Sequence, residues 1–107
     1  MAFNIVNPLF PKPTFHASAQ VAAQRLTVTS TATVQFSAFD GSTDMVTFDV
    51  QTAGVYCTFD GTTPSATAGH ILAPGEKYTW SAAGAKLAKF VATTTTNAII
   101  YGSEFQL

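Results

Sequence analysis

Residues 45–60, MVTFDVQTAGVYCTFD, decide the fold class of this chain. Apolar side chains occupy every second position on both sides of Ala53-Gly54, first Val46, Phe48 and Val50, then Val55, Cys57 and Phe59. A period of two puts the apolar side chains on one face of a strand and the polar ones on the other. The stretch therefore predicts two half-buried strands joined by a tight turn.

The same alternation recurs on both sides of this stretch. It appears upstream in RLTVTS (25–30) and TVQFSAF (33–39), and downstream in HIL (70–72), EKYTW (76–80), KFVATT (89–94) and AIIYGSEFQL (98–107). Residues 81–90, SAAGAKLAKF, permit one helical turn capped by Ser81 rather than a full helix, because Gly84 interrupts a short segment. The last two strands are expected to form a closing hairpin around Thr95-Thr96-Asn97.

Turn signals separate these strands every eight to twelve residues. Seven or eight short strands of this kind predict an all-β protein with a single β-sandwich, either immunoglobulin-like or jelly-roll-like. Between the strands at 55–60 and 70–72 the chain carries turn residues at Asp60, Gly61, Pro64 and Gly69. We expect this connection to be a corner where the chain leaves one sheet and enters the other, with Cys57 and His70 placed there for packing.

The first 23 residues differ from the rest of the chain. Pro8, Pro11 and Pro13 exclude a continuous helix or a central strand, because each lacks a backbone donor. The segment is nevertheless too apolar for a solvated linker, since it contains Phe3, Ile5, Val6, Leu9, Phe10 and Phe15. Residues 1–23 are therefore expected to form an extended arm, and residues 24–107 the sandwich domain. The arm either wraps its own domain or binds a partner through these six side chains.

Composition narrows the function classes. Charged residues make up 10% of the 107 residues and the net charge is −1, so no basic patch exists to bind nucleic acid. A near-neutral surface of hydroxyls and small side chains favours packing against other copies, and we expect a homo-oligomer. One cysteine excludes an internal disulfide. The sequence also shows no export signal and no membrane-spanning stretch.

Catalytic and metal-binding patterns are weak throughout. Cys57 lies on the apolar side of its strand, which indicates a small buried hydrophobe rather than a nucleophile. His16 and His70 have no second ligand at zinc spacing, and Asp40 and Asp60 each precede a glycine, as turn-forming aspartates do. We therefore expect no enzyme activity, no catalytic residues, no metal site and no cofactor.

The stretch VYCTFDGTTPSATAGHILAPGEKYTW (55–80) resembles small all-β structural proteins from the head and neck of tailed bacteriophages. It is also similar, more distantly, to immunoglobulin-like modules. The resemblance implies a virion protein assembled in the host cytoplasm, foremost a capsid cement or decoration protein that binds the major capsid protein or other virion proteins. A neck or tail protein is one alternative, and a carbohydrate-binding module using Tyr78 and Trp80 is another.

Overall fold

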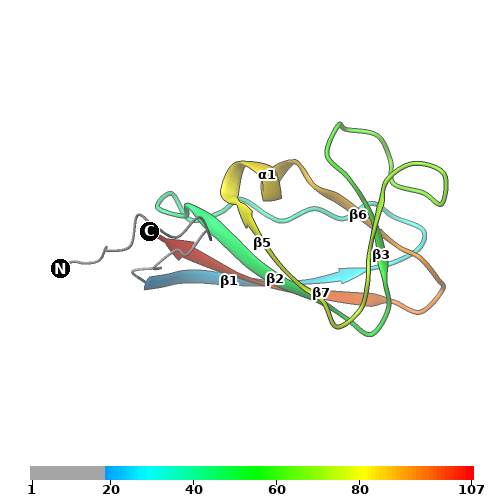
Figure 1. Cartoon of the computed structure of the whole chain (residues 1–107), viewed down its shortest axis with the longest axis horizontal. Helices are drawn as coiled ribbons and strands as arrows, with labels where there is room; N and C mark the ends of the chain where they lie inside the picture. The colour runs from blue at the N-terminus through cyan, green and yellow to red at the C-terminus, as the bar shows by residue number, and fades with distance from the viewer. Residues whose placement is uncertain (1–18) are drawn as a thin grey trace, which may run out of the picture.

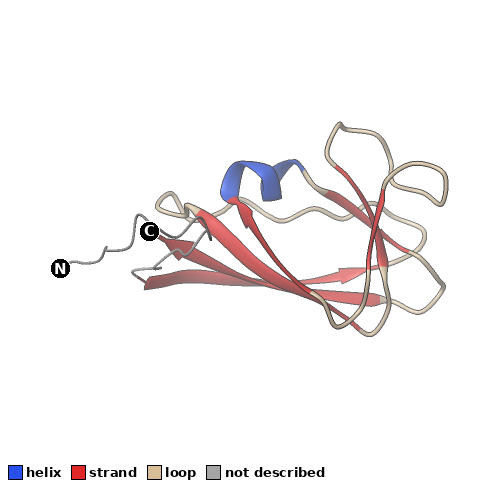
Figure 2. Ribbon diagram, in the orientation of Figure 1, coloured by secondary structure: helices blue, strands red, loops and turns tan. Residues whose placement is uncertain are grey.

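The structure is a computed structural model that describes residues 19–107 as two packed antiparallel sheets (Figures 1 and 2). The predicted all-β sandwich is confirmed. The larger sheet has the strand order β1-β7-β2-β5, with β1 at Ala19–Val28, β7 at Ala98–Gln106, β2 at Met45–Gln51 and β5 at Lys77–Ser81. The smaller sheet has the order β4-β3-β6, with β4 at His70–Leu72, β3 at Val55–Thr58 and β6 at Lys89–Ala92.

A six-residue helix, α1 at Ala82–Leu87, follows β5. Ser81 is its N-cap, because the Ser81 hydroxyl accepts a hydrogen bond of 3.1 Å from the Gly84 amide. The sequence predicted this cap but only a single turn. Burial of Ala85 against the core stabilises a helix that is too short to persist alone.

The core lies between the two sheets and is built from the alternating residues of the central strands. Phe48 and Phe90 face each other across it with ring centroids 6.1 Å apart, and Phe36 packs edge-on against both. Fifteen buried hydrophobic residues of the described chain, between Val28 and Ile100, make up this cluster. The alternation seen in the sequence thus separates buried from outward positions on β2 and β6.

Residues 33–39 do not form the predicted strand. Only Val34 pairs, in an isolated bridge with Phe90. Phe36 enters the core above Gly102, where a Cβ would come within 2.9 Å of the ring. The backbone of Ser37 is bound by the Gln24 side-chain amide instead of a neighbouring strand. The alternation in residues 33–39 therefore directs side chains such as Phe36 into the core, but the segment does not pair as a strand.

Two predicted connections are also wrong. β6 and β7 do not form a hairpin, because β6 pairs with β3 whereas β7 lies between β1 and β2 in the other sheet. Residues 59–69 do not cross between sheets either, since they join β3 to its neighbour β4 within the smaller sheet. The chain changes sheets after β2, β4, β5 and β6.

The start of the sandwich also differs from the sequence expectation. β1 begins at Ala19, so residues 19–23 pair with β7 although the sequence placed them in the arm. Their small side chains, AQVAA, gave no alternation by which to recognise a strand, and a register shift lies between Gln20 and Ala22.

Candidate functional site

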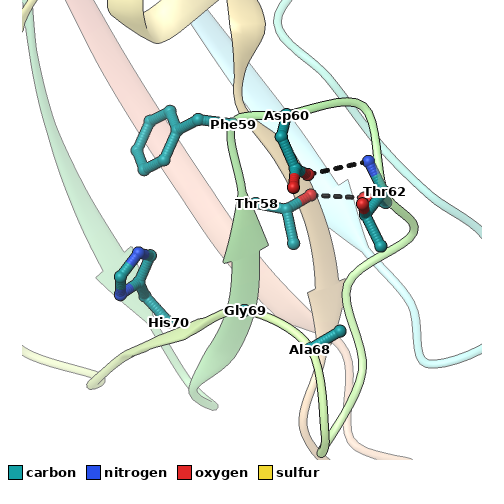
Figure 3. Close-up of a pocket in the computed structure, with 7 residues that line it drawn as sticks. All are labelled: Thr58, Phe59, Asp60, Thr62, Ala68, Gly69 and His70. Atoms are coloured by element: carbon teal, nitrogen blue, oxygen red, sulfur yellow. Dashed lines mark hydrogen bonds between the residues drawn. The ribbon is translucent and has the colours of Figure 1, made fainter.

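The end of β3 and the connection to β4 enclose a shallow hollow of about 350 Å³ (Figure 3). It is lined by Thr58, Phe59, Asp60, Thr62, Ala68, Gly69 and His70. The hollow lies in the segment whose turn residues stand between Cys57 and His70 in the sequence. It is therefore the first place to test for chemistry.

The polar groups of this hollow hold the loop in shape. The Asp60 carboxylate accepts a hydrogen bond of 3.0 Å from the Thr62 amide, and this bond holds the pKa of Asp60 below its usual value. The Thr58 hydroxyl donates to the Thr62 carbonyl, as Figure 3 shows. The Lys89 ammonium donates to the Gly61 carbonyl at 3.0 Å. These groups are engaged by the loop itself, which is the behaviour of an Asx turn.

The backbone of the connection requires glycine at two positions. Gly61 has a φ of 89°, and Gly69 has a φ of 127° at the point where β4 begins. A Cβ on Gly69 would lie 2.8 Å from the Cys57 carbonyl oxygen, so only glycine allows this close approach. Pro64 is buried beside Ser65, whose backbone pairs with Ala68 to close the loop.

His70 differs from its sequence expectation, because its side chain is exposed rather than packed. Its ring lies at the mouth of the hollow, 6.2 Å from the Phe59 ring centroid (Figure 3). The Phe59 ring in turn packs on the Trp80 ring, with the ring centroids 4.9 Å apart. His70 sits opposite Cys57 in the strand register, but the thiol points into the core, away from any substrate.

Cys57 is fully buried, as the sequence predicted. Burial raises the pKa of its thiol to about 12, so the nucleophilic thiolate is absent at neutral pH. Within residues 19–107 no group of three or more His, Cys, Asp or Glu side chains is placed to hold a metal ion. The hollow therefore offers neither an activated nucleophile nor a ligand set.

A buried carboxylate that sequence reasoning missed lies at the other end of the molecule. Glu104 on β7 is 2% exposed and accepts hydrogen bonds from the Asp40 amide and the Thr43 hydroxyl, both at 2.9 Å, and from Gln24 at 3.2 Å. It borders a groove of about 560 Å³ between β1 and residues 37–40. Because two of its donors, the Asp40 amide and the Thr43 hydroxyl, belong to the segment that precedes β2, Glu104 fixes that segment on the sheet. The alternation of β7 was the available signal, since it places Glu104 on the inner face with Ile100 and Gly102.

Tyr78 and Trp80 do not form a platform for sugar rings. Both lie on the inner face of β5 and pack on Phe48, with centroid distances of 5.3 and 4.7 Å. The carbohydrate-binding interpretation is thereby corrected, because the aromatic faces it needed are used inside the sandwich.

The six apolar side chains predicted to bind a partner, between Phe3 and Phe15, lie outside the described residues. Within the described part of the chain, no helix has the length and apolar character required to span a membrane.

Comparisons with known proteins do not assign this chain to a family. No family model matches the chain, and no curated protein matches it. A solved structure from Bacillus endospore appendages, described as a family of disulfide-linked pili, is similar with a TM-score of 0.39 and 10% identity. The match covers 92% of this chain and 99% of that chain. At this similarity no function passes from one protein to the other.

The phage interpretation is corrected on these findings. The solved structure that resembles this chain comes from a spore appendage and not from a phage particle. The capsid, neck and tail assignments, the capsid-protein partner and the virion location are withdrawn with it. Within the quoted 55–80 stretch, residues 59–69 join β3 to β4 in one sheet and residues 73–76 lead to β5 in the other. Turn residues of this kind fix the backbone and do not specify a function.

Proposed function

We propose that this protein is a non-catalytic structural subunit that associates with other copies of itself through its N-terminal arm, residues 1–18. The observation that supports this most directly is the completeness of the sandwich. Residues 28–100 supply fifteen buried hydrophobic side chains, and both sheets contribute to one continuous core. The arm is not needed to fill that core, so its six large apolar side chains call for another surface.

The energetics favour a docked arm. Burying six side chains of this kind contributes roughly 10 kcal/mol of gross transfer free energy before ordering costs are subtracted. Pro8, Pro11 and Pro13 restrict the unbound segment, which lowers the entropy lost on docking. The low charge of the chain adds little repulsion between copies.

The non-catalytic part of the proposal rests on the hollow at the end of β3. Its carboxylate and hydroxyls are engaged within the loop, and the neighbouring thiol is buried in its protonated form. A disulfide-linked assembly is also disfavoured, because the single cysteine of the chain has no exposed sulfur to offer a neighbour.

Deleting residues 2–18 tests the proposal. We expect the shortened protein to keep its melting temperature to within a few degrees while losing the oligomer that the full chain forms, as measured by sedimentation velocity. A full-length variant with the six apolar arm residues replaced by serine is the matched control for chain length. A shortened protein that melts many degrees lower would instead show that the arm wraps its own domain. A full chain that stays monomeric at about 100 µM would also overturn the proposal, because a self-association with a dissociation constant in the micromolar range would be visible at that concentration.

A further inference from the structure

Three apolar side chains lie side by side on the outer face of the smaller sheet. Tyr56 on β3 is directly opposite Ile71 on β4 and directly opposite Val91 on β6. The sequence neighbours of Tyr56 and Val91 are buried in the core, so these two side chains point outward. Ile71 is 69% exposed, the highest value among the large hydrophobic residues of the described chain. We call Ile71, Tyr56 and Val91 the apolar row.

We propose that the apolar row receives the N-terminal arm of a second copy of this chain. This inference rests on the proposed function and adds the receiving surface. The row contains no charged residue, and directly opposed side chains of neighbouring strands form a continuous surface. Lys89, two residues before Val91 on β6, donates a hydrogen bond to the Gly61 carbonyl.

The size of the row favours an extended segment as its occupant. Three adjacent strands span roughly 10 Å, since neighbouring strands lie about 4.8 Å apart. A stable interface between two rigid domains buries about 800 Å² on each partner, which is much more than such a row offers. An apolar extended segment can cover the row with two or three side chains and continue over adjacent surface. The arm has this composition.

The position of Ala19, where the described chain begins, favours a second copy. β1 begins at the end of the molecule opposite β3 and β6, so the arm leaves the domain far from its own apolar row (Figure 1). Eighteen residues reach about 60 Å at full extension, and the molecule is 48 Å long. Binding its own row would require the arm to reverse at Ala19 and run back along much of the length of the molecule. A copy placed at that end presents its row much closer, in a head-to-tail contact that repeats from copy to copy.

A pair of charge substitutions on the full-length chain tests the row. Ile71→Asp should weaken self-association at least about tenfold in sedimentation equilibrium, because it places a charge where an apolar side chain is covered. Leu87→Asp is the matched control, since Leu87 is 59% exposed on α1 and outside the row. It should change the association by less than about twofold. Both variants should melt like the parent protein, because both side chains are solvent-exposed. Equal effects of the two substitutions would overturn the inference.

Photocross-linking identifies the occupant directly. The full chain is prepared in ¹⁴N and ¹⁵N forms with p-benzoylphenylalanine at position 71, and the two forms are mixed, irradiated and digested. We expect cross-links from position 71 to residues 1–18 that join different isotopes, and none of this kind from position 87. Same-isotope cross-links alone would place the arm on its own domain and overturn both proposals. An oligomer with no cross-link from position 71 to residues 1–18 would overturn this inference and leave the proposed function standing.

Discussion

Cys57 illustrates how one side chain responds to its surroundings. Its thiol is buried in the core and donates a hydrogen bond to the Thr58 carbonyl, with the sulfur 3.9 Å from that oxygen. Burial raises the pKa from 9.0 to about 12, because the thiolate has no charge or strong donor to stabilise it there. The residue therefore contributes to the fold in the way a small hydrophobe does.

Replacing Cys57→Ala should lower the free energy of unfolding by about 1–2 kcal/mol at pH 7. This difference should shrink as the pH rises. Below pH 9.0 the thiol is protonated in both states, but from 9.0 towards 12 it ionises in the unfolded chain while the folded chain keeps the proton, so the native state of the parent loses stability. Urea unfolding of both proteins at pH 7.5 and at pH 10.5, on either side of the unfolded-state value, measures the change. A difference that stays constant would contradict the raised pKa.

Glu104 differs from Cys57 because its buried carboxyl group accepts hydrogen bonds from several neutral donors. Glu104→Ala should cost about 2–4 kcal/mol, because the Asp40 amide and the Thr43 hydroxyl lose their acceptor in a buried place. Glu104→Gln keeps one acceptor oxygen and should cost less. Gln106→Ala, an exposed position on the same strand, is the control and should change stability by less than about 0.5 kcal/mol. Chemical denaturation measures all three, and a Glu104→Ala value no larger than the control would be inconsistent with the hydrogen-bond network.

The connection between β3 and β4 shows what a loop needs in order to return a strand to its own sheet. Asp60 and Gly61 start the turn, and Gly69 brings the chain against the carbonyl of Cys57 as pairing with β3 begins. β4 has only three residues with which to pair, so the position at which the loop returns the chain matters for its register. Backbone conformation, more than side-chain contact, therefore fixes this edge of the smaller sheet.

Two glycine substitutions separate strain from collision. Gly69→Ala should destabilise the protein by about 2–4 kcal/mol, because its Cβ adds a clash with backbone to an unfavourable φ of 127°. Gly75→Ala also has a positive φ, 89°, but its Cβ meets nothing within 4 Å. It should cost only about 1 kcal/mol. Thermal and urea denaturation compare the two, and equal losses would mean that the close approach at Gly69 is relieved by a small backbone movement.

The whole molecule is poor in charge, with five basic and six acidic residues among 107. Association of such a protein through an apolar arm should not depend on ion pairs. We expect the self-association constant to stay level or to rise between 50 mM and 500 mM NaCl, two concentrations chosen for the experiment that span strong and weak screening. Sedimentation equilibrium at both salt concentrations measures it. A marked loss of the oligomer in high salt would point to a charged interface and away from the arm.

The local pattern of side chains determined most of the strands, with residues 33–39 and the start of β1 as the exceptions. Alternation at 45–60 specifies two half-buried strands wherever they pair, because the pleat alone sends successive side chains to opposite faces. For the same reason the burial of Cys57 followed from its position between Val55 and Phe59, and the Ser81 cap followed from a hydroxyl before a short helical segment. These are properties that a residue and its near neighbours decide.

The tertiary structure alone decided which strands became neighbours. Alternation is identical for a strand in either sheet, so it could not show that β6 joins β3 while β7 is inserted between β1 and β2. Pairing depends on long-range packing and on loop closure, whose free energies are not written in any one segment. The same holds for the site: Glu104 meets Asp40 across 64 positions, and the apolar row assembles from three separate strands. Neither group of residues comes together until the chain folds.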